Sequence, residues 1–512
     1  MKPWLILTAL IQVIALTCAS AVAQVAPTAF AITGEIDSFT VATPGNPLSA
    51  AIIVIHGITI DIPANLIVQM PATYLTPSDI VQLNPLNPGV ESGLAKKDTT
   101  PPLVSFEATA VGNIIAGKHI AGLVYISQGF LTVGAGYITS IGSGRPDEMT
   151  VGGDPTAAPA ATDVKVRLND PSGRFGIKTT WDPRFTADTG NPTIHAETGY
   201  PMCLPRNAAD DECPETNRPM AGGIHMTSFV MGTTPLPATP AGAPIVPPCP
   251  GCNPNFQAPF EVGDYITFSG IYQEDSPGAT FIAAHTITAA IGIYTAPGVD
   301  PAYLSIEGSL VGTRGVTVTN PSLPPQETQD RFKLEGRTTD PSRSVDAYAL
   351  DVNTTTGAKT YRFLFTPTKV NGPRGRFRFI IGKAAGVLFA GGATMGATRE
   401  LAIHVHSSTE SPVAHLTGTT VVEPKPPISP PPPGTVSNGL IANQYIAPVG
   451  EYIFPESLVP GLVALPNNFE CLAFLQKGSG PLTTSTNISP AVGRLVPWPG
   501  GPTATTLMFC GP

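Results

Sequence analysis

Short runs of alternating apolar and polar residues recur along the chain, and glycine often interrupts them. The stretch AIIVIHGITIDIP, from Ala51 to Pro63, places isoleucines at alternating positions on both sides of Gly57. The stretch FEVGDYITFSGIYQE, from Phe260 to Glu274, has the same alternation around Gly270. A period of two predicts strands with one buried face, and a glycine within a strand predicts a bend or a close backbone approach. The pattern therefore predicts tightly curled sheets.

Two of these stretches resemble each other. Residues 116–141 and 262–291 each contain a glycine followed by isoleucine, then a second glycine followed by tyrosine, and each closes on Ile-Thr. This weak internal repeat predicts two related barrel domains, at 27–149 and 162–296. In that alignment Gly122 and Gly270 are equivalent corner residues, and a β-carbon at either is expected to destabilise its barrel.

One group of residues carries a family resemblance. Gly-Asp-x-Ile-x-Phe-x-Gly, beginning at Gly263, is followed by a hairpin and by FIAAHTI. This order resembles the strands of an OB-type barrel, as found in uncharacterised secreted β-rich proteins. The resemblance covers about half of the chain and implies architecture without a catalytic motif.

The C-terminal half changes character twice. From Asp330, short strands separated by Asp-Pro, Thr-Gly and Gly-Pro turns recur about every ten residues, which predicts an immunoglobulin-like sandwich at 300–422. EPKPPISPPPPG predicts a polyproline linker at 423–435. An irregular, disulfide-closed tail is expected at 436–512. The whole chain is therefore expected to be all-β, with two OB-like barrels, a sandwich and a proline-rich tail.

The N-terminus has the order of a secretory signal. Lys2 precedes an apolar run that ends near Thr17, and Ala21-Val22-Ala23 is a small-residue cleavage site. We expect a signal peptide at 1–23 and a secreted, extracellular or wall-bound mature chain without a transmembrane anchor.

Composition narrows the class further. The 52 glycines and 57 prolines disfavour long helices. The net charge of −9 disfavours nucleic acid as a partner, because phosphate contacts need a basic surface. The serine-hydrolase elbow, the phosphate loop and the dinucleotide fingerprint do not occur in the sequence.

Six cysteines follow the signal segment, and an even number in an exported chain predicts disulfides. The local solution pairs Cys203 with Cys213 and Cys471 with Cys510. Cys249 and Cys252 either pair with each other or cross with the first two. Four of the six lie in a proline-rich insertion at 199–259, which they are expected to tie down.

Candidate chemical sites are few. His404 and His406 are two apart on a predicted strand, so they share a face and are the metal ligands considered; a solvated strand face is the favoured interpretation. Cys249-Pro-Gly-Cys252 has redox spacing but lacks the βαβ context. The triplet Asp210-Asp211-Glu212 lacks a calcium-loop period, and we expect a solvated loop.

The remaining candidates are surface features. Tyr265, Tyr272 and Phe281 are considered as an aromatic platform, with ordinary barrel packing favoured. Asn353 and Asn487 lie in sequons that accept a glycan in a eukaryotic host.

These observations favour a secreted, non-catalytic β-protein with a structural, wall, matrix or binding role. Its expected partners are a wall or matrix polysaccharide or a surface protein, and no cofactor or metal is expected. The alternative is a secreted hydrolase or biosynthetic enzyme with its site between domains. Converging carboxylates or histidines would favour the alternative.

Overall fold

The computed structural model describes residues 28–314 and 328–448 with gaps, the longest being 353–357, 383–399, 407–414 and 422–438, together with residues 483–484 and 487–488. The predicted signal peptide, the polyproline linker, Asn353 and the Cys471–Cys510 pair lie outside the described residues. Asn487 begins the short strand β30 (Asn487–Ile488), which pairs with β29 (Thr483–Thr484). The described part is nearly all β, as the sequence predicts.

The first unit is a closed five-stranded barrel with OB-like topology. Its strands follow the order β3-β2-β1-β6-β7, and β3 closes the ring by running parallel to β7. Between the third and fourth barrel strands come two short strands and the helix α2 (Pro77–Gln82). The barrel strands are β1 (Thr28–Val41), β2 (Ala51–Ile55), β3 (Ile58–Ile62), β6 (Phe106–Ile115) and β7 (Lys118–Gln128); the short strands are β4 (Val68–Gln69) and β5 (Tyr74–Leu75).

The second unit repeats this topology. Its order is β10-β9-β8-β18-β19, and β10 closes the ring parallel to β19. The strand β11 (Ile194–Ala196) then adds parallel to β19, as β4 adds parallel to β7 in the first barrel. The barrel strands are β8 (Val133–Ile141), β9 (Glu148–Gly152), β10 (Val164–Leu168), β18 (Tyr265–Glu274) and β19 (Thr280–Ala289).

This pairing moves the boundary between the barrels. The sequence placed it at residue 149, but β8 and β9 hydrogen-bond within the second barrel. The first barrel therefore ends with β7, and the second begins with β8. The repeat at 116–141 misled the sequence reasoning because it joins the last strand of one barrel to the first strand of the next.

The shared feature of the barrels is instead a bulge opposite a glycine. Gly112 pairs with Ala121, and Gly122 is the extra residue of its bulge. Gly270 pairs with Ala284, and His285 is the extra residue there. A β-carbon on Gly112 would overlap the carbonyl oxygen of Ile120, and one on Gly270 would lie 2.7 Å from the Cα of Ala284. The equivalent of Gly270 is therefore Gly112, and the assignment of Gly122 is wrong.

The third unit consists of two four-stranded antiparallel sheets. Their orders are β21-β22-β26-β25 and β24-β23-β27-β28, which correspond to the ABED and C′CFG sheets of an immunoglobulin-like sandwich. One sheet contains β21 (Leu304–Arg314), β22 (Thr328–Thr338), β25 (Thr368–Lys369) and β26 (Arg376–Gly382). The other contains β23 (Val345–Val352), β24 (Lys359–Phe365), β27 (Glu400–Val405) and β28 (Gln444–Pro448).

The last strand of the sandwich lies beyond the predicted linker. β28 pairs with β27 over five residues, and Leu440 joins the buried cluster of the second barrel. The boundary at 422 is therefore wrong, because part of the predicted tail completes the sandwich. Leu440 and the partly buried Ala442 thus pack against the second barrel.

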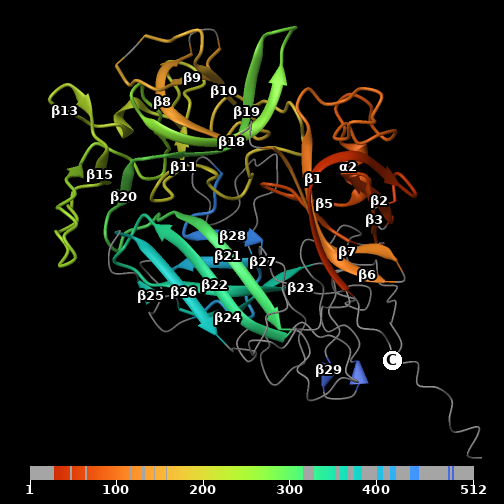
Figure 1. Ribbon diagram of the computed structural model, residues 1–512. Coiled ribbons are helices and arrows are strands. Elements are labelled where there is room, and N and C mark those ends of the chain that lie inside the picture. Colours follow the sequence, from red (N-terminus) through yellow and green to blue (C-terminus); the bar gives the residue numbers. More distant parts are fainter. Residues whose placement is uncertain are drawn as a thin grey trace, which may run out of the picture.

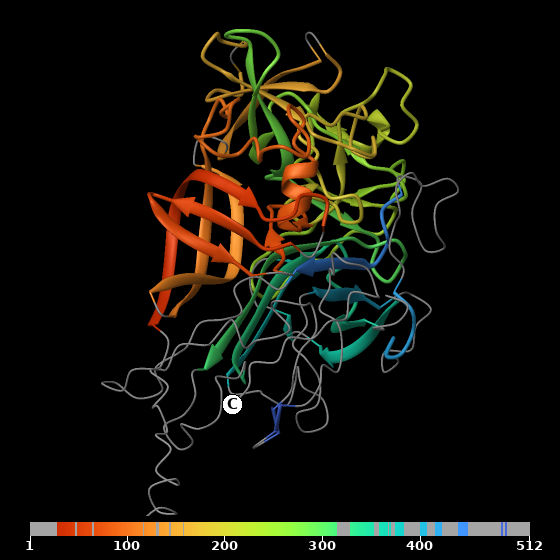
Figure 2. The same ribbon diagram turned by 90° about the vertical axis from the view of Figure 1, so that its right-hand side faces the viewer.

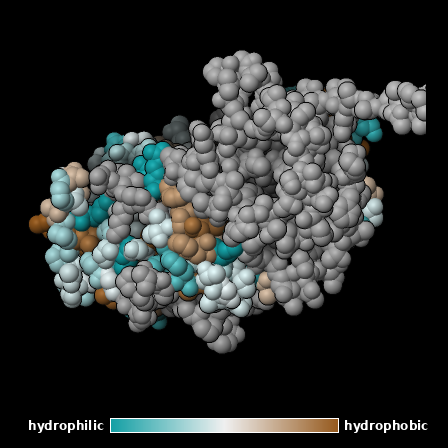
Figure 3. Space-filling view, turned by 90° about the horizontal axis from the view of Figure 1, so that it is seen from below, coloured by the Kyte–Doolittle hydropathy of each residue, from teal (hydrophilic) through white to brown (hydrophobic). Residues whose placement is uncertain are grey.

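The three units pack against one another (Figures 1 and 2). The first barrel, in red and orange, lies beside the second, whose strands run from orange to green, and the sandwich lies below the second barrel and beside the lower part of the first. A single buried apolar cluster includes residues from the first barrel, the sandwich and one face of the second barrel. Phe185 of the second unit stacks on Phe106 of the first, with ring centroids 5.1 Å apart. Seen from below (Figure 3), hydrophilic residues and grey atoms surround one hydrophobic area on the face turned to the viewer.

Candidate functional site

Two clusters of histidine and carboxylate side chains occur in the described part of the chain. One is Asp346, His406 and His415 in the sandwich, and the other is Glu215, His225 and Glu261 in the insertion of the second barrel. In each cluster one ligand atom from every residue lies within 4.8 Å of the other two. The two clusters differ in whether hydrogen-bond donors face the carboxylates.

In the sandwich cluster, donors surround one buried carboxylate. Nε2 of His406 lies 2.6 Å and Nδ1 of His415 lies 2.9 Å from the same oxygen, Oδ2 of Asp346. The hydroxyl of Tyr348 donates to that oxygen over 3.2 Å, and Thr366 donates to Oδ1 over 2.6 Å. The carboxylate is thus fully satisfied by hydrogen bonds.

The electrostatics of Asp346 follow from these donors. Burial alone would raise the pKa of this carboxyl, but the hydrogen bonds from Thr366, His406 and His415 outweigh burial and lower the pKa. Asp346 is therefore ionised at neutral pH, and both imidazoles turn an N–H toward it. His404, the other histidine that the sequence singled out, lies two residues earlier on β27 and is not one of the three.

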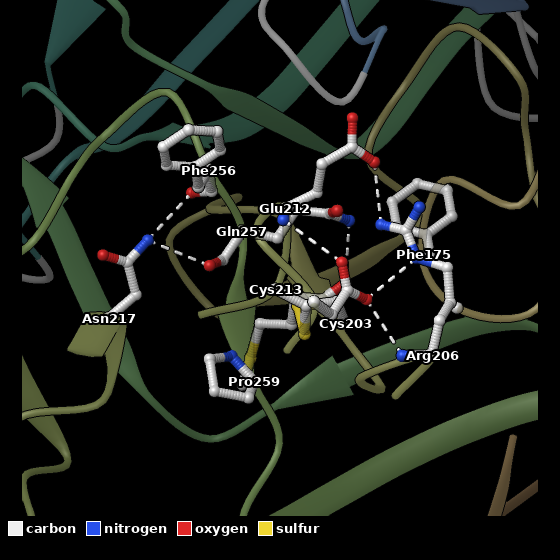
Figure 4. The surroundings of a disulfide bond; sticks show 12 residues. Phe175, Cys203, Arg206, Glu212, Cys213, Asn217, Phe256, Gln257 and Pro259 are labelled. Atoms are coloured by element: carbon white, nitrogen blue, oxygen red, sulfur yellow. Dashed lines mark hydrogen bonds and ion pairs between the residues drawn. A yellow bond between two sulfur atoms is a disulfide. The ribbon is translucent and has the colours of Figure 1, made fainter. Parts of the chain in front are cut away.

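The insertion cluster is held by the cysteine-rich segment. Disulfides join Cys203 to Cys213 and Cys249 to Cys252, which decides among the connectivities left open by the sequence. Figure 4 shows the first of them, with Arg206 and Glu212 close by. Arg206 forms ion pairs with Asp210 and with Glu212, each over 2.8 Å. Two of the three acidic side chains that were considered as calcium ligands are thus paired with Arg206.

The three side chains of the insertion cluster come from different local elements. Glu215 begins the 3₁₀ helix η2 (Glu215–Asn217), and His225 ends β14 (Ile224–His225), the second strand of a hairpin with β13 (Met220–Ala221). Glu261 follows β17 (Ala258–Pro259). Nε2 of His225 lies 3.5 Å from Oε2 of Glu261 and 3.8 Å from Oε1 of Glu215.

A buried ion pair lies directly behind this cluster. Both terminal nitrogens of Arg218 donate to Asp264, over 2.7 and 2.8 Å. Asp264 also accepts the backbone N–H of Glu261 over 2.8 Å. Burial, with the charge of Glu215 close by, raises the pKa of Glu261 to about 8. A negative charge on Glu261 is therefore poorly compensated.

The structure separates the three residues that were considered as an aromatic platform. Phe281 is buried beneath Arg167, whose guanidinium lies 4.0 Å from the ring centroid. Tyr272 packs partly against the second-barrel core. Tyr265 is exposed, and its ring meets Tyr137 edge-on, with centroids 5.1 Å apart. The solvent-facing pair is therefore Tyr137 and Tyr265, from the paired strands β8 and β18.

Sequence reasoning missed Asp346, His415 and the whole insertion cluster. Glu261 lies only nine positions before Gly270, in a stretch that the sequence singled out for its alternation. Its neighbours Glu215 and His225 belong to other segments, and no spacing rule links the three. The one available signal was the presence of four cysteines around these segments.

Comparisons with known proteins add little. No family model matches the chain, and no curated protein matches it. One solved structure is a Ca²⁺-stabilized adhesin that helps an Antarctic bacterium reach out and bind ice; it is 12% identical, with 77% of this chain and 67% of that chain covered, at a TM-score of 0.10. A similarity this low carries no argument. Among the described residues, no helix combines the length and apolarity needed to span a membrane.

Proposed function

We propose that the protein is an exported, non-catalytic structural or binding component of a cell wall or extracellular matrix. The observation that supports this role is the set of buried polar side chains that join the three units. Arg184, fully buried in the second unit, donates to the carbonyl oxygens of Ile80 and Ser92 in the first. Such contacts oppose the relative motion that separate domains usually retain.

The junction with the sandwich has the same character. Asn191 of the second unit exchanges two hydrogen bonds with the backbone of Ile446 on β28, over 2.6 and 2.9 Å. Arg343 pairs with Asp340 over 2.8 Å and also with Asp300, in the segment that joins barrel and sandwich. A rigid three-unit body suits a spacer or scaffold, whose task is to keep a fixed shape.

Export is part of the proposal. The two disulfides of the insertion are compatible with an oxidising compartment, and the N-terminal sequence has the features of a secretory signal.

For the binding partner we favour a polysaccharide. Tyr137 and Tyr265 stand on the outer face of the second barrel, where Tyr265 is 41% exposed. Thr267 and Ala135 are exposed beside them on the same two strands. Aromatic rings next to small and hydroxylated residues offer stacking and hydrogen bonds to sugar rings. The net charge of −9 disfavours nucleic acid.

Sedimentation with insoluble wall or matrix polysaccharides tests this function. We expect the wild-type protein to sediment with at least one of them, and Tyr265→Ala to weaken binding about tenfold, or roughly 1.4 kcal/mol. Tyr125→Ala is the matched control, because Tyr125 is similarly exposed, at 37%, on the first barrel. A wild-type protein that stays in the supernatant with every material, or equal losses in both variants, would contradict the proposal.

A second candidate is an exported enzyme, which the sandwich cluster favours. His415 is 34% exposed, donates Nδ1–H to the buried Asp346 and stacks on Phe363. A carboxylate that fixes one nitrogen of an accessible imidazole is an arrangement used in general-base catalysis. Hydrolysis of activated esters or glycosides that is lost in His415→Ala, with the fold retained, would support the enzyme over the scaffold.

A further inference from the structure

In the insertion cluster the histidine donates its hydrogen bond away from the carboxylates, whereas in the sandwich cluster both histidines donate toward Asp346. Nδ1 of His225 lies 3.1 Å from the backbone carbonyl oxygen of Arg218. A carbonyl oxygen only accepts, so Nδ1 carries the proton. In the neutral ring Nε2 then holds a lone pair, and this lone pair faces Glu261 and Glu215.

Three side chains with ligand lone pairs therefore converge, and one proton, held by Glu261 at neutral pH, is shared among them. The carboxylate oxygens of Glu261 and Glu215 lie 3.5 and 3.8 Å from Nε2, beyond normal hydrogen-bond lengths. The other oxygen of Glu261, Oε1, is buried without a hydrogen-bond partner. Either a proton or a metal cation must lie among these groups to offset their repulsion, and only a divalent cation lets all three serve as ligands at once.

The spacing fits ligands that share one metal ion. Nitrogen and oxygen ligands bind zinc at about 2.0–2.2 Å, which puts tetrahedral neighbours roughly 3.4 Å apart. The charges fit as well, because two carboxylates balance a divalent ion while Arg218 is already neutralised by Asp264. Ligating histidines usually donate their second nitrogen to a carbonyl or carboxylate, as His225 does.

The surroundings hold the ligands in place. Asn217, fully buried at the end of η2, donates to the carbonyl oxygens of Asn253, Phe256 and Gln257; Figure 4 shows two of these bonds. The sulfur of Cys252 lies 3.4 Å from the carbonyl oxygen of Thr216, next to Glu215. The Arg218–Asp264 pair positions both ligands behind it. The carbonyl oxygen of Arg218 accepts from Nδ1 of His225, and Asp264 accepts the backbone N–H of Glu261. The insertion is thus anchored around the point where the three ligands meet.

The sandwich cluster lacks this arrangement. There His406 turns Nε2–H toward Asp346, and its other nitrogen, Nδ1, is buried with no hydrogen-bond partner. A metal on Nε2 would leave Nδ1–H buried without an acceptor, which is costly. In the sandwich cluster the carboxylate is therefore satisfied by hydrogen bonds, whereas in the insertion cluster the histidine lone pair faces two glutamates.

The geometry points to a divalent transition-metal site formed by Glu215, His225 and Glu261, with Zn²⁺ as the representative ion. The imidazole favours zinc and related metals over calcium or magnesium, which prefer all-oxygen ligands. Glu215 is 68% exposed, so the remaining coordination position is open to water.

Isothermal titration of the full mature chain with zinc chloride, after removal of metals by a chelator, tests the site. We expect one Zn²⁺ per chain at pH 7, and a loss of affinity of at least roughly tenfold in Glu261→Gln and His225→Gln. Glu215→Gln should weaken binding too. Because the Glu215 side chain is exposed, this substitution is not expected to unfold the protein, so weaker binding would report the loss of a ligand. His415→Gln, in the sandwich cluster, is the matched control and should bind as wild type.

Three results would overturn the site. The first is a wild-type chain that takes up no Zn²⁺. The second is zinc binding that His415→Gln abolishes and the three insertion variants retain. The third is calcium binding at the same residues without zinc binding. If His225 instead carries a second proton that bridges the two glutamates, the wild-type titration is flat, and its imidazole nitrogens both report N–H by NMR.

Discussion

The two barrels share one framework and differ in what they carry between the third and fourth strands. In the first barrel this segment holds α2 and two short strands. In the second it holds two disulfides, the Arg218–Asp264 pair and the Glu215–His225–Glu261 cluster. The comparison teaches that the closed sheet is a common support, and that distinctive chemistry resides in the insertion, as is usual for segments that connect strands.

A smaller difference lies within the sheets themselves. At the bulge of the last barrel strand the first barrel has Gly122, and the second has His285. His285 is buried, and burial lowers its pKa to about 4. Substitutions at Gly112 and Gly270 test what the barrels share, and a substitution at His285 tests how they differ.

The largest expected effect is at the shared glycines. Gly112→Val and Gly270→Val should each lower the free energy of unfolding by about 3 kcal/mol or more, because the new side chain would overlap the backbone of the facing strand. Urea unfolding measures this loss. Gly153→Val is the control, since a β-carbon there meets nothing within 4 Å. If only one of the two glycine variants is destabilised, the barrels are not equivalent at this position.

Acid should lower the stability of the second barrel more than that of the first, because only the second has a buried histidine at the bulge. His285 has a folded pKa of about 4 against an ordinary 6.5, so between these values the unfolded chain binds more protons. The stability that His285 contributes is present above pH 6.5 and is lost as the pH falls toward 4, by up to roughly 3 kcal/mol. His285→Gln should remove this part of the acid sensitivity in unfolding measured at pH 7 and pH 5. An unchanged pH dependence would show that His285 has the same pKa in the folded and unfolded states.

Loss of the Cys203–Cys213 disulfide should lower the free energy of unfolding by less than the glycine substitutions do. Replacing Cys203 and Cys213 by alanine should cost about 2–3 kcal/mol, the chain-entropy value for a loop of this size. Hydrogen exchange should locate the loss in residues 199–264 and leave 28–128 unchanged. Faster exchange in the first barrel as well would mean that the insertion supports more than its own barrel.

The sequence predicted the sheets better than their boundaries. Alternation around Gly57 and Gly270 revealed strands, because burial of one face imposes that pattern locally. Pairing between distant strands leaves no such trace, so β8 was assigned to the wrong barrel and β28 was placed in the tail. Two related barrels were correctly expected, but the aligned segments 116–141 and 262–291 are not equivalent, because the first joins the last strand of one barrel to the first strand of the next.

The candidate site was harder to foresee for a related reason. Glu215, His225 and Glu261 meet only because the disulfides and Asn217 fold the insertion back on itself. Asp346 and His415 are separated by most of the sandwich. His406 was singled out from its spacing with His404, but its partner lies on a neighbouring strand. Spacing rules find sites within one element, and both clusters assemble across several.

The most direct measurement of the central claim is hydrogen exchange with and without a saturating concentration of Zn²⁺. If Glu215, His225 and Glu261 bind the ion, exchange should slow in residues 213–226 and 257–264, while the first barrel and the sandwich around Asp346 stay unchanged. A concentration of 100 times the dissociation constant stabilises the bound form by about 2.7 kcal/mol, enough to slow local opening about a hundredfold. Unchanged exchange in these two segments, or protection centred on His406 and His415 instead, would contradict the account.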